Sequence, residues 1–362
     1  MARFIAFYLP QFHPTPENDE WWGKGFTEWV NVAKARPLYR GHDEPHIPAD
    51  LGFYDLRLPE VREQQAVLAR KAGIDGFCYY HYWFGNGRQI LERPFNEVVK
   101  SGKPDFPFCL CWANHSWYKK LWDPNNKNKD KLLVEQLYPG EKDYIEHFNA
   151  LLPAFKDKRY IKVDGKLFFI IYDAIKFDEV DKFIRIWRDL AKQNGLSDFY
   201  FVATDQDSRN KEAIISKGVD AIYNSDQFNI HHHLSIWKKV LLYVSRRWLK
   251  RPTVFDYRDA ANYMMNDDCK SRSTIPCILP NWDHSPRSGA NAIILKNAKP
   301  EYFKQLAKKA IKMVANKPEE EQIVIIKSWN EWGEGNYMEP DQEFGLGYIN
   351  ALREAIEETK QK

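Results

Sequence analysis

The sequence predicts a (β/α)₈ barrel, and three observations support this fold class. Short apolar runs typical of buried parallel strands recur eight times, amphipathic stretches lie between them, and the chain is 362 residues long. A hydrophobic content of 44% is enough to fill one large core. We therefore expect a single elaborated domain over residues 1–362, with a basic amphipathic insertion around residues 227–255.

The eight strand candidates are each followed by a loop and then by a helical stretch. In chain order they are residues 4–8, 76–82, 107–112, 167–172, 199–204, 221–223, 275–279 and 323–327. Most are continuous apolar runs, as expected for strands covered on both faces. Such strands indicate a parallel sheet with helices outside it.

The helical candidates show apolar residues at helical spacing, which predicts one buried face for each. They are residues 59–72, 143–155, 179–194, 209–217, 300–315 and 348–359. In a (β/α)₈ barrel the loops that follow the strands converge over one packed core, so functional residues are expected there.

Charge and composition narrow the partner class. The formal net charge is +3 at pH 7, which does not require nucleic acid as a partner. The chain holds 13 Trp, 19 Tyr and 22 Phe, a richness that favours stacking on flat ligand surfaces such as sugar rings. No apolar run approaches the roughly 20 residues that span a bilayer. We expect an oligosaccharide or polysaccharide substrate.

The cysteines and the start of the chain predict a cytoplasmic protein. Cys78, Cys109, Cys111, Cys269 and Cys277 form an odd set without the spacing of a disulfide framework or a zinc site. A strand pattern begins directly after Arg3, which leaves no room for a secretory leader.

Polar side chains follow every predicted strand. They are Gln11 and His13, His81 and Trp83, Asn114 and His115, Asp173, Asp205 and Asp207, Asn224 and Asp226, Asn281, Trp282 and Asp283, and finally Glu331 and Glu334. Any one of them alone is explained by a cap or a turn. Their recurrence predicts one ring-shaped polar site, with Tyr8, His81, Asn114 and Trp282 facing the same cavity as the two glutamates.

The segment after the last strand carries the strongest chemical signal. Residues 328–340 read SWNEWGEGNYMEP and place Glu331 and Glu334 three positions apart among aromatic residues and glycines. Cleavage of a glycosidic bond needs one carboxyl group to protonate the leaving oxygen and a second to act as base or nucleophile. The alternative is a strand end whose two glutamates face solvent.

Four motifs together resemble one known family. They are residues 7–13 (FYLPQFH), 20–29 (EWWGKGFTEW), 76–84 (GFCYYHYWF) and 328–340. The chain resembles the WbsX-type family from residue 4 to about residue 348. That family is usually described as glycosyltransferases of surface polysaccharide loci, and it is related to glycoside hydrolase family 99.

The resemblance implies a fold, a reaction and roles for two residues. Family 99 enzymes are (β/α)₈ barrels that cleave α-mannosidic bonds with retention, and residues 330–335 match their Asn-Glu-Trp-x-Glu-Gly motif. By this resemblance, Glu331 is the base that draws the proton from the sugar 2-hydroxyl, which attacks the anomeric carbon to give an anhydro-sugar. Glu334 is then the acid and afterwards the base. An acid needs a raised pKa, which burial beside Trp332 would supply.

A larger set of residues is expected to contact the glycan. This set is Tyr8, Gln11, His13, Glu28, Trp29, His81, Trp83, Asn114, His115, Trp117, Tyr172, Asp205, Asn281, Trp282, Asp283, Trp332, Tyr337 and Glu339. His115 stands where the family commonly has a glutamate after the asparagine. A histidine favours a different arrangement of hydroxyls, so the sugar is left open between mannose and another.

No metal or nucleotide cofactor is expected. Asp205 and Asp207 form an Asp-x-Asp pattern used by metal-dependent glycosyltransferases, although a turn cap explains the pair more simply. His231, His232 and His233 are adjacent and cannot all converge on one ion, so a solvated loop is the preferred interpretation. No glycine-rich phosphate loop is present.

Residues 227–255 contain no acidic residue and six basic ones. The basic residues are Lys238, Lys239, Arg246, Arg247, Lys250 and Arg251, and apolar residues at helical spacing lie between them. One interpretation is a helix on an anionic membrane surface, which would make the protein peripheral to the inner membrane and its glycan lipid-linked. The other is an insertion with one packed and one solvated face.

Three function classes remain open on the sequence. A hydrolase or transglycosylase needs only the two glutamates and a ring of sugar contacts. A sugar-nucleotide glycosyltransferase also needs a diphosphate site, for which Asp205 and Asp207 are the sole candidates. A glycan-binding barrel without activity is disfavoured because both glutamates are retained. We expect family 99-like hydrolysis, with glycosyl transfer as the alternative.

Overall fold

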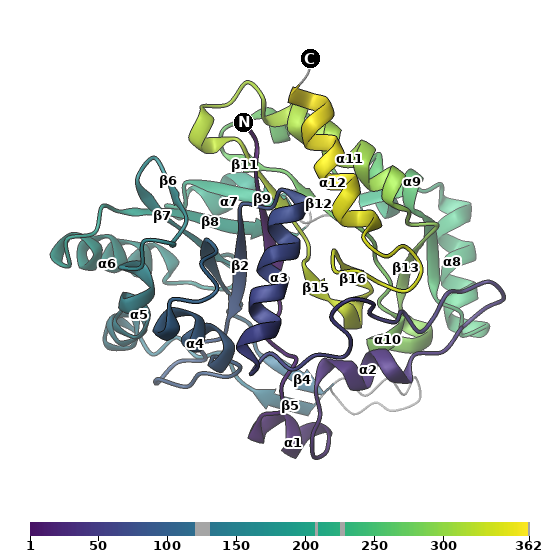
Figure 1. Cartoon of the computed structure of the whole chain (residues 1–362), viewed down its shortest axis with the longest axis horizontal. Coiled ribbons are helices and arrows are strands. Elements are labelled where there is room, and N and C mark those ends of the chain that lie inside the picture. The colour runs from purple at the N-terminus through teal and green to yellow at the C-terminus, as the bar shows by residue number, and fades with distance from the viewer. Residues whose placement is uncertain (120–130, 207–208, 225–228, 361–362) are drawn as a thin grey trace.

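The computed structural model describes residues 1–119, 131–206, 209–224 and 229–360, and its centre is a parallel sheet (Figure 1). The strands of this sheet are β1 (Arg3–Tyr8), β2 (Gly76–His81), β3 (Phe108–Trp112), β7 (Lys166–Ile171), β8 (Phe199–Asp205), β9 (Ala221–Asn224), β11 (Thr274–Ile275), β12 (Cys277–Ile278) and β14 (Ile323–Ile326). Their order is β11-β9-β8-β7-β3-β2-β1-β14-β12, and the pairs along this path are parallel.

The two ends of this order are halves of one strand. β11 pairs with β9, β12 pairs with β14, and Pro276 alone separates them. Proline has no N–H to give to a ladder, but the Pro276 carbonyl accepts from the Ile325 N–H at 2.9 Å. The order therefore closes, and the predicted (β/α)₈ barrel is confirmed, with its seventh strand beginning at Thr274 and broken at the proline.

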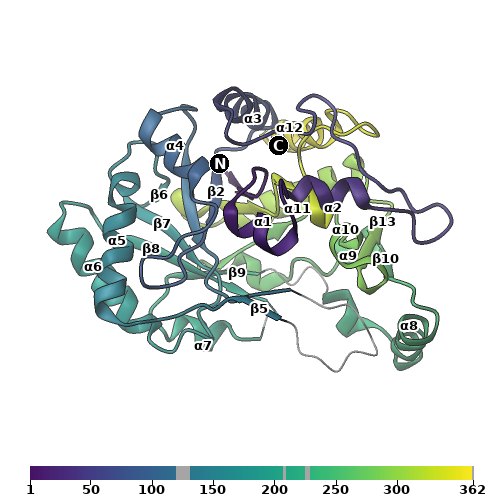
Figure 2. The ribbon, with the colours of Figure 1, turned by 90° about the horizontal axis from the view of Figure 1, so that it is seen from below.

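Helices follow the strands and cover the outside of the barrel (Figures 1 and 2). They are α3 (Pro59–Ala72), α4 (Arg93–Ser101), α5 (Glu141–Phe155), α6 (Val180–Gln193), α7 (Lys211–Ile215), α11 (Pro300–Val314) and α12 (Gly347–Lys360). The predicted bounds of α3 are met, and the other predicted helices differ by a few residues at their ends. The sequence did not indicate α4, which has only nine residues and a proline in its first turn.

Further elements elaborate the loops. They are α1 (Pro16–Trp22), α2 (Glu28–Lys34), β4 (Trp117–Lys119), β5 (Lys131–Val134), β6 (Lys162–Val163), η1 (Asn229–His233), α8 (Ile236–Trp248), β10 (Thr253–Asp256), α9 (Tyr257–Ala261), η2 (Asp267–Lys270), α10 (Ser285–Ser288), η3 (Gly289–Asn291), β13 (Ile293–Lys296), η4 (Glu319–Glu321), β15 (Asn330–Glu331), η5 (Trp332–Glu334) and β16 (Asn336–Tyr337). β4 pairs with β5, β10 with β13 and β15 with β16, all outside the barrel sheet. β6 pairs with the first residues of β7 in an antiparallel manner.

The barrel strands are buried along their length, which explains their continuous apolar runs. All residues of β2, β3 and β8 are buried, as expected for strands between a packed barrel interior and a layer of helices. All five cysteines are free and buried. Within the described part of the chain, no helix combines the length and apolarity needed to cross a bilayer.

Candidate active site

A cavity of about 580 Å³ lies at the C-terminal ends of the barrel strands. Its lining comes from β2 and from the segments that follow β1, β3, β7, β12 and β14. Seven residues predicted for the site line it, namely Gln11, Glu28, His115, Trp117, Tyr172, Glu331 and Glu334. The cavity is therefore built where the barrel architecture places functional loops.

The hairpin of β15 and β16 carries both glutamates into this cavity. The Ser328 hydroxyl accepts from the Glu331 N–H at 3.0 Å and donates to the Asn336 carbonyl at 2.7 Å. Asn330 is fully buried and ties the hairpin to the end of β1, because its side chain accepts from the Leu9 N–H at 2.7 Å and donates to the Leu9 carbonyl at 3.1 Å. Both strands of the hairpin are thus fixed to the barrel.

Two glycines of the motif are required by close approaches. A Cβ on Gly333 would lie 1.8 Å from Glu28 Oε1, so no side chain fits there. Gly335 has φ +51, a conformation that favours glycine, and a Cβ there would lie 2.7 Å from the Asp283 Cβ. The glycines let the turn that bears Glu334 pack directly against α2 and the segment after β12.

The aromatic residues of the motif support the hairpin from behind. Trp332 stacks on Tyr337 with ring centroids 3.8 Å apart, and its indole N–H donates to Glu339 Oε2 at 2.6 Å. Glu339 also accepts from Gln65 at 2.6 Å and from the Tyr54 hydroxyl at 2.9 Å. Trp332, Tyr337 and Glu339 are buried packing partners and do not line the cavity.

Glu334 lies among three basic side chains. Arg287 donates to Glu334 Oε1 at 2.5 Å and to Glu28 Oε1 at 2.8 Å, while Lys327 Nζ lies 3.8 Å from Glu334 Oε2. Burial alone would raise the pKa of Glu334, but Lys327, Arg287 and His284 outweigh burial and lower it. Glu334 is therefore an ionised carboxylate in this structure, whereas the sequence predicted a raised pKa for it.

Glu331 shows the opposite shift. Burial raises its pKa, and the charge of Glu334 raises it further, against the opposing effect of Lys327 and Arg287. Tyr80 and Tyr82 line the cavity on the same side, and the charge of Glu331 helps to raise the pKa of both phenols beyond the effect of their burial. The two glutamates thus form a pair in which Glu331 holds the proton more readily.

Within the described ranges, each glutamate has one oxygen without a hydrogen bond, and that of Glu334 faces Lys327 Nζ at 3.8 Å. Oε2 of Glu331 and Oε2 of Glu334 are buried and have no hydrogen-bond partner among the described residues. Buried carboxylate oxygens are nearly always hydrogen-bonded, so the two free oxygens suit hydroxyl groups of a bound molecule. Aromatic side chains also line the cavity and offer flat faces to a sugar ring, namely Trp22, Phe26, Trp117, Tyr118 and Tyr172.

Several predicted site residues lie away from the cavity, among them Tyr8, His81 and Trp83 at the ends of β1 and β2. His81 contacts His147 of α5 through their Nε2 atoms at 2.8 Å, and Trp83 donates to Asp143 of the same helix at 3.0 Å. The Tyr8 hydroxyl donates to Gln65 of α3 at 2.6 Å. These side chains point outward to the helices because neighbouring residues of a strand face opposite sides.

Other predicted residues position main chain around the cavity. Asn114 brackets Asp173, accepting from its N–H at 2.7 Å and donating to its carbonyl at 2.9 Å. Asn281 accepts from the Tyr337 N–H at 2.9 Å, and the indole of Trp29 donates to the Tyr54 carbonyl at 2.7 Å. Their role in this structure is to position these segments.

The remaining predicted residues are also buried or packed. Trp282 lies under Lys327, whose Nζ is 5.0 Å from the ring centroid, and Asp205 accepts from the Asn210 N–H at 3.2 Å. His13 is buried, and burial lowers its pKa. Asp207 and Asp226 lie outside the described residues, and His231, His232 and His233 are exposed on η1.

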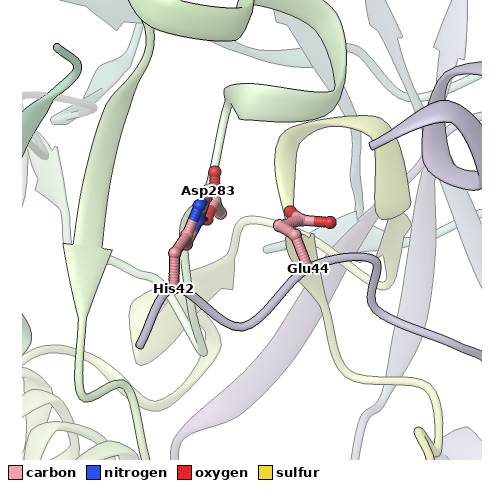
Figure 3. Close-up of side chains that lie close together, drawn as sticks. All are labelled: His42, Glu44 and Asp283. Carbon is pink, nitrogen blue, oxygen red and sulfur yellow. Dashed lines mark hydrogen bonds and ion pairs between the residues drawn. The ribbon is translucent and has the colours of Figure 1, made fainter. Parts of the chain in front are cut away.

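Figure 3 shows His42, Glu44 and Asp283, the one group in the described ranges with metal-ligand proximity. His42 Nδ1 accepts from the Leu38 N–H at 3.0 Å, so the proton resides on Nε2, which donates to Asp283 Oδ2 at 2.6 Å. The Nε2 atom of His42, which faces Asp283, is therefore already engaged in a hydrogen bond. Burial, and then the charge of Asp283, raises the pKa of Glu44 to about 8, which favours its neutral form.

This cluster supports the turn that bears Glu334. The Asp283 N–H donates to the Glu334 carbonyl at 2.8 Å, and Asp283 Oδ1 accepts from the Ser285 N–H at 2.8 Å. His42 thereby positions Asp283, and Asp283 in turn positions the main chain of Glu334.

Sequence reasoning missed the basic residues of the cavity. Lys327 ends the predicted eighth strand, and its position next to the motif was a usable signal. Arg287 lies on α10 in the insertion after β12, and no sequence pattern identifies it. Tyr80 and Tyr82 lie within a recognised motif. The sequence does not say which side of β2 faces the cavity, so it could not separate these two tyrosines from His81.

Solved structures with similar folds are glycoside hydrolases. One, described as a glycoside hydrolase-like protein, has a TM-score of 0.63 at 15% identity and covers 98% of this chain and 93% of its own. Another, the GH99 endo-alpha-mannosidase from Bacteroides thetaiotaomicron in complex with BIS-TRIS-Propane, has a TM-score of 0.58 at 16% identity and covers 99% of this chain and 98% of its own. At these identities the likeness shows the fold.

Sequence comparison gives the family. The protein described as "Uncharacterized protein WxcX" from Xanthomonas campestris pv. campestris (strain B100) is 34% identical over 98% of this chain and 50% of its own length. The chain thus spans about half the length of the curated relatives it matches. The model of the family described as "Glycosyltransferase WbsX" matches residues 4–352. The barrel is similar in fold to that of the family 99 enzyme. Because the family model matches nearly the whole chain, the chain belongs to the WbsX glycosyltransferase family of carbohydrate-active proteins.

Proposed function

We propose that the protein cleaves an α-glycosidic, mannoside-like bond in an oligosaccharide or polysaccharide, with retention, through Glu331 and Glu334. The observation that carries the proposal is the pair of buried carboxylates at one cavity, each with a free oxygen and with opposite pKa shifts. One carboxyl that holds a proton beside one that is ionised is what acid–base cleavage of a glycosidic bond requires.

The reaction would proceed in two balanced steps. One glutamate takes the proton of the sugar 2-hydroxyl, the 2-oxygen bonds to the anomeric carbon, and the other glutamate protonates the departing oxygen. Water then opens the anhydro-sugar, giving one proton to the second glutamate, while the first returns its proton to the 2-oxygen. No step needs a metal or a nucleotide.

The roles of the two glutamates can be assigned in two ways. The resemblance to family 99 implies Glu331 as the base and Glu334 as the acid. The charges in this structure favour the reverse, since Arg287 and Lys327 keep Glu334 ionised. An α-glycosyl fluoride separates the two assignments because fluoride leaves without a proton. The variant of the acid should still release fluoride in the first step, although opening of the anhydro-sugar then limits turnover, whereas the variant of the base should lose fluoride release itself.

Glycosyl transfer from a sugar nucleotide is the second candidate, favoured by the description of the family. The described residues give it little support, because Asp205 is buried and hydrogen-bonded to the Asn210 N–H. A glycan-binding barrel without activity is the third candidate, and the opposite pKa shifts of the two glutamates, which binding alone does not require, argue against it.

Product analysis separates these candidates. The protein is incubated with α-linked oligosaccharides and, separately, with sugar nucleotides plus acceptors, and the products are identified by mass spectrometry. Glu331→Gln and Glu334→Gln should each lower hydrolysis by roughly 100- to 10,000-fold, as expected for loss of a required acid or base. Glu135→Gln, an exposed change just after β5, is the matched control. Hydrolysis that survives in either cavity variant would contradict the proposal.

A further inference from the structure

The helix α8 (Ile236–Trp248) has an unusual surface. Seven of its apolar side chains are exposed, and both tryptophans are among the most open of them, Trp237 at 83% and Trp248 at 77%. The others are Ile236, Val240, Leu241, Tyr243 and Val244. Isolated exposed apolar residues are ordinary, but a cluster on one helix marks an interaction surface.

The exposed residues form a continuous stripe. Trp237, Val240, Leu241, Val244 and Trp248 follow the spacing i, i+3, i+4, i+7, i+11, which places them on one side of a helix. The opposite side faces the protein through Lys239, Leu242 and Ser245, which are half-buried, and Leu242 packs against the core. The sequence allowed the apolar face of this helix either to pack against the protein or to contact a membrane. In the structure this face is exposed.

The helix itself carries charge of one sign, although Asp259 of α9 lines the same pocket as Lys238. Lys238 and Arg246 are exposed and Lys239 is half-buried, while residues 229–255 contain no acidic residue. Residues 227 and 228 of the predicted segment lie outside the described residues, as does the side chain of Arg247. Tryptophan at both ends of an apolar stripe, with Lys238 beside it and further cations around the same helix, matches the interface between the head groups and acyl chains of an anionic bilayer.

We propose that α8 is an interfacial helix that binds the surface of a membrane containing anionic lipids. The charge complementarity selects this partner over a second copy of the chain, because self-association through α8 would bring its cations together. η1 and α8 follow β9, so the helix emerges from the barrel end that holds the cavity (Figure 2). If the proposed function also holds, a glycan carried on a lipid would be presented at that end.

Fluorescence on vesicles tests the helix without any assay of activity. Because all five native cysteines are buried, Leu241→Cys can be labelled selectively with an environment-sensitive dye in the full chain. Its emission should rise and shift to the blue with vesicles of phosphatidylcholine and phosphatidylglycerol. Val67→Cys, which is 60% exposed on α3, is the matched control and should not respond.

Two further variants separate the contributions. Lys238→Gln/Lys239→Gln/Arg246→Gln should lower vesicle affinity by about 100-fold at low salt, corresponding to ~1 kcal/mol for each cation. Trp237→Ser/Trp248→Ser should abolish the blue shift while the circular dichroism spectrum stays unchanged. Salt should release the parent protein, because screening shortens the range of the attraction.

Two kinds of result would contradict membrane binding by α8. Equal response to anionic and neutral vesicles, or none to either, overturns the proposal. A dimer in light scattering that Leu241→Glu dissociates also overturns it, in favour of a second copy as the occupant. Since no substrate is used, failure here leaves the hydrolase proposal untouched, and failure of the hydrolase assay leaves this result standing.

Discussion

Arg287 joins two carboxylates that come from distant parts of the chain. Its guanidinium group binds Glu28 of α2 and Glu334 of the motif, and only 24% of its side chain is exposed. This half-buried cation lowers the pKa of Glu334, so the electrostatics of the cavity depend on a residue that no motif contains.

Replacing Arg287 should therefore move the pH profile. Because Arg287 lowers the pKa of Glu334, Arg287→Gln should raise that pKa and shift the limb governed by Glu334 to higher pH. We expect kcat/KM at neutral pH to fall about 10- to 100-fold, as for loss of a buried charge-assisted hydrogen bond. Arg185→Gln, at a 71% exposed side chain, is the control. An unshifted limb would show that Arg287 does not set the ionisation of Glu334.

A second residue-scale prediction concerns the close contact at Gly333. Gly333→Ala would place a methyl group 1.8 Å from Glu28 Oε1, so either the Glu28 carboxylate, with its ion pair to Arg287, or the turn that bears Glu334 must move. We expect loss of most hydrolytic activity and a lower Tm. Adding Glu28→Asp, which shortens the carboxylate by one methylene, should recover part of the Tm. Wild-type activity in the single variant would mean that the turn tolerates the shift.

At the scale of elements, the hairpin of β15 and β16 depends on one buried amide. Asn330→Ala leaves the Leu9 N–H and carbonyl without their partners, and each unsatisfied buried group costs about 1 to 3 kcal/mol. We expect urea denaturation to show a loss of about 2 to 4 kcal/mol in the free energy of unfolding. Asn350→Ala, on the exposed side of α12, should be close to neutral. A loss below 1 kcal/mol would indicate that the hairpin is held elsewhere.

The elements also show which parts of the site were predictable. Glu331, Glu334 and Glu28 were found because they lie in motifs, and Gln11 because it lies in the loop that follows β1. At β2 the prediction chose His81, whereas Tyr80 and Tyr82 line the cavity. Every residue of β2 is buried, so no alternation of polar and apolar residues reveals which side faces inward.

Insertions were the least predictable elements. Arg287 and the pair β10 and β13 lie in segments whose position is set by tertiary contacts, and composition alone does not place them. The helix α8 was recognised from its spacing, but only its exposure decides which face is free.

For the whole molecule, buried titratable groups predict how stability depends on pH. Burial lowers the pKa of His81 from 6.5 to about 3, so the unfolded chain binds more protons in that interval and stability falls as pH falls through it. Burial, then the charge of Asp283, raises the pKa of Glu44 from 4.5 to about 8, so the folded protein binds more protons there and stability falls as pH rises.

The two effects oppose each other between the ordinary pKa of Glu44, 4.5, and that of His81, 6.5, so together they predict a maximum of Tm in the mildly acidic range. Glu44→Gln removes the second group and should flatten the alkaline decline of Tm between pH 6 and 8, as measured by calorimetry across a pH series. Glu146→Gln, at a 49% exposed side chain, should leave the profile unchanged. An alkaline decline of the same slope in Glu44→Gln would assign that decline to other groups.

The pairing of β1 with β14 links the two ends of the barrel, with Arg3 opposite Ile323. During synthesis on the ribosome, one edge of β1 must wait for its partner while more than three hundred further residues are added. At 5 to 20 residues per second this delay is about 15 to 65 s. Throughout it the nascent chain displays an open apolar strand edge, so its yield in the cell should depend on chaperones that shield such edges until translation ends.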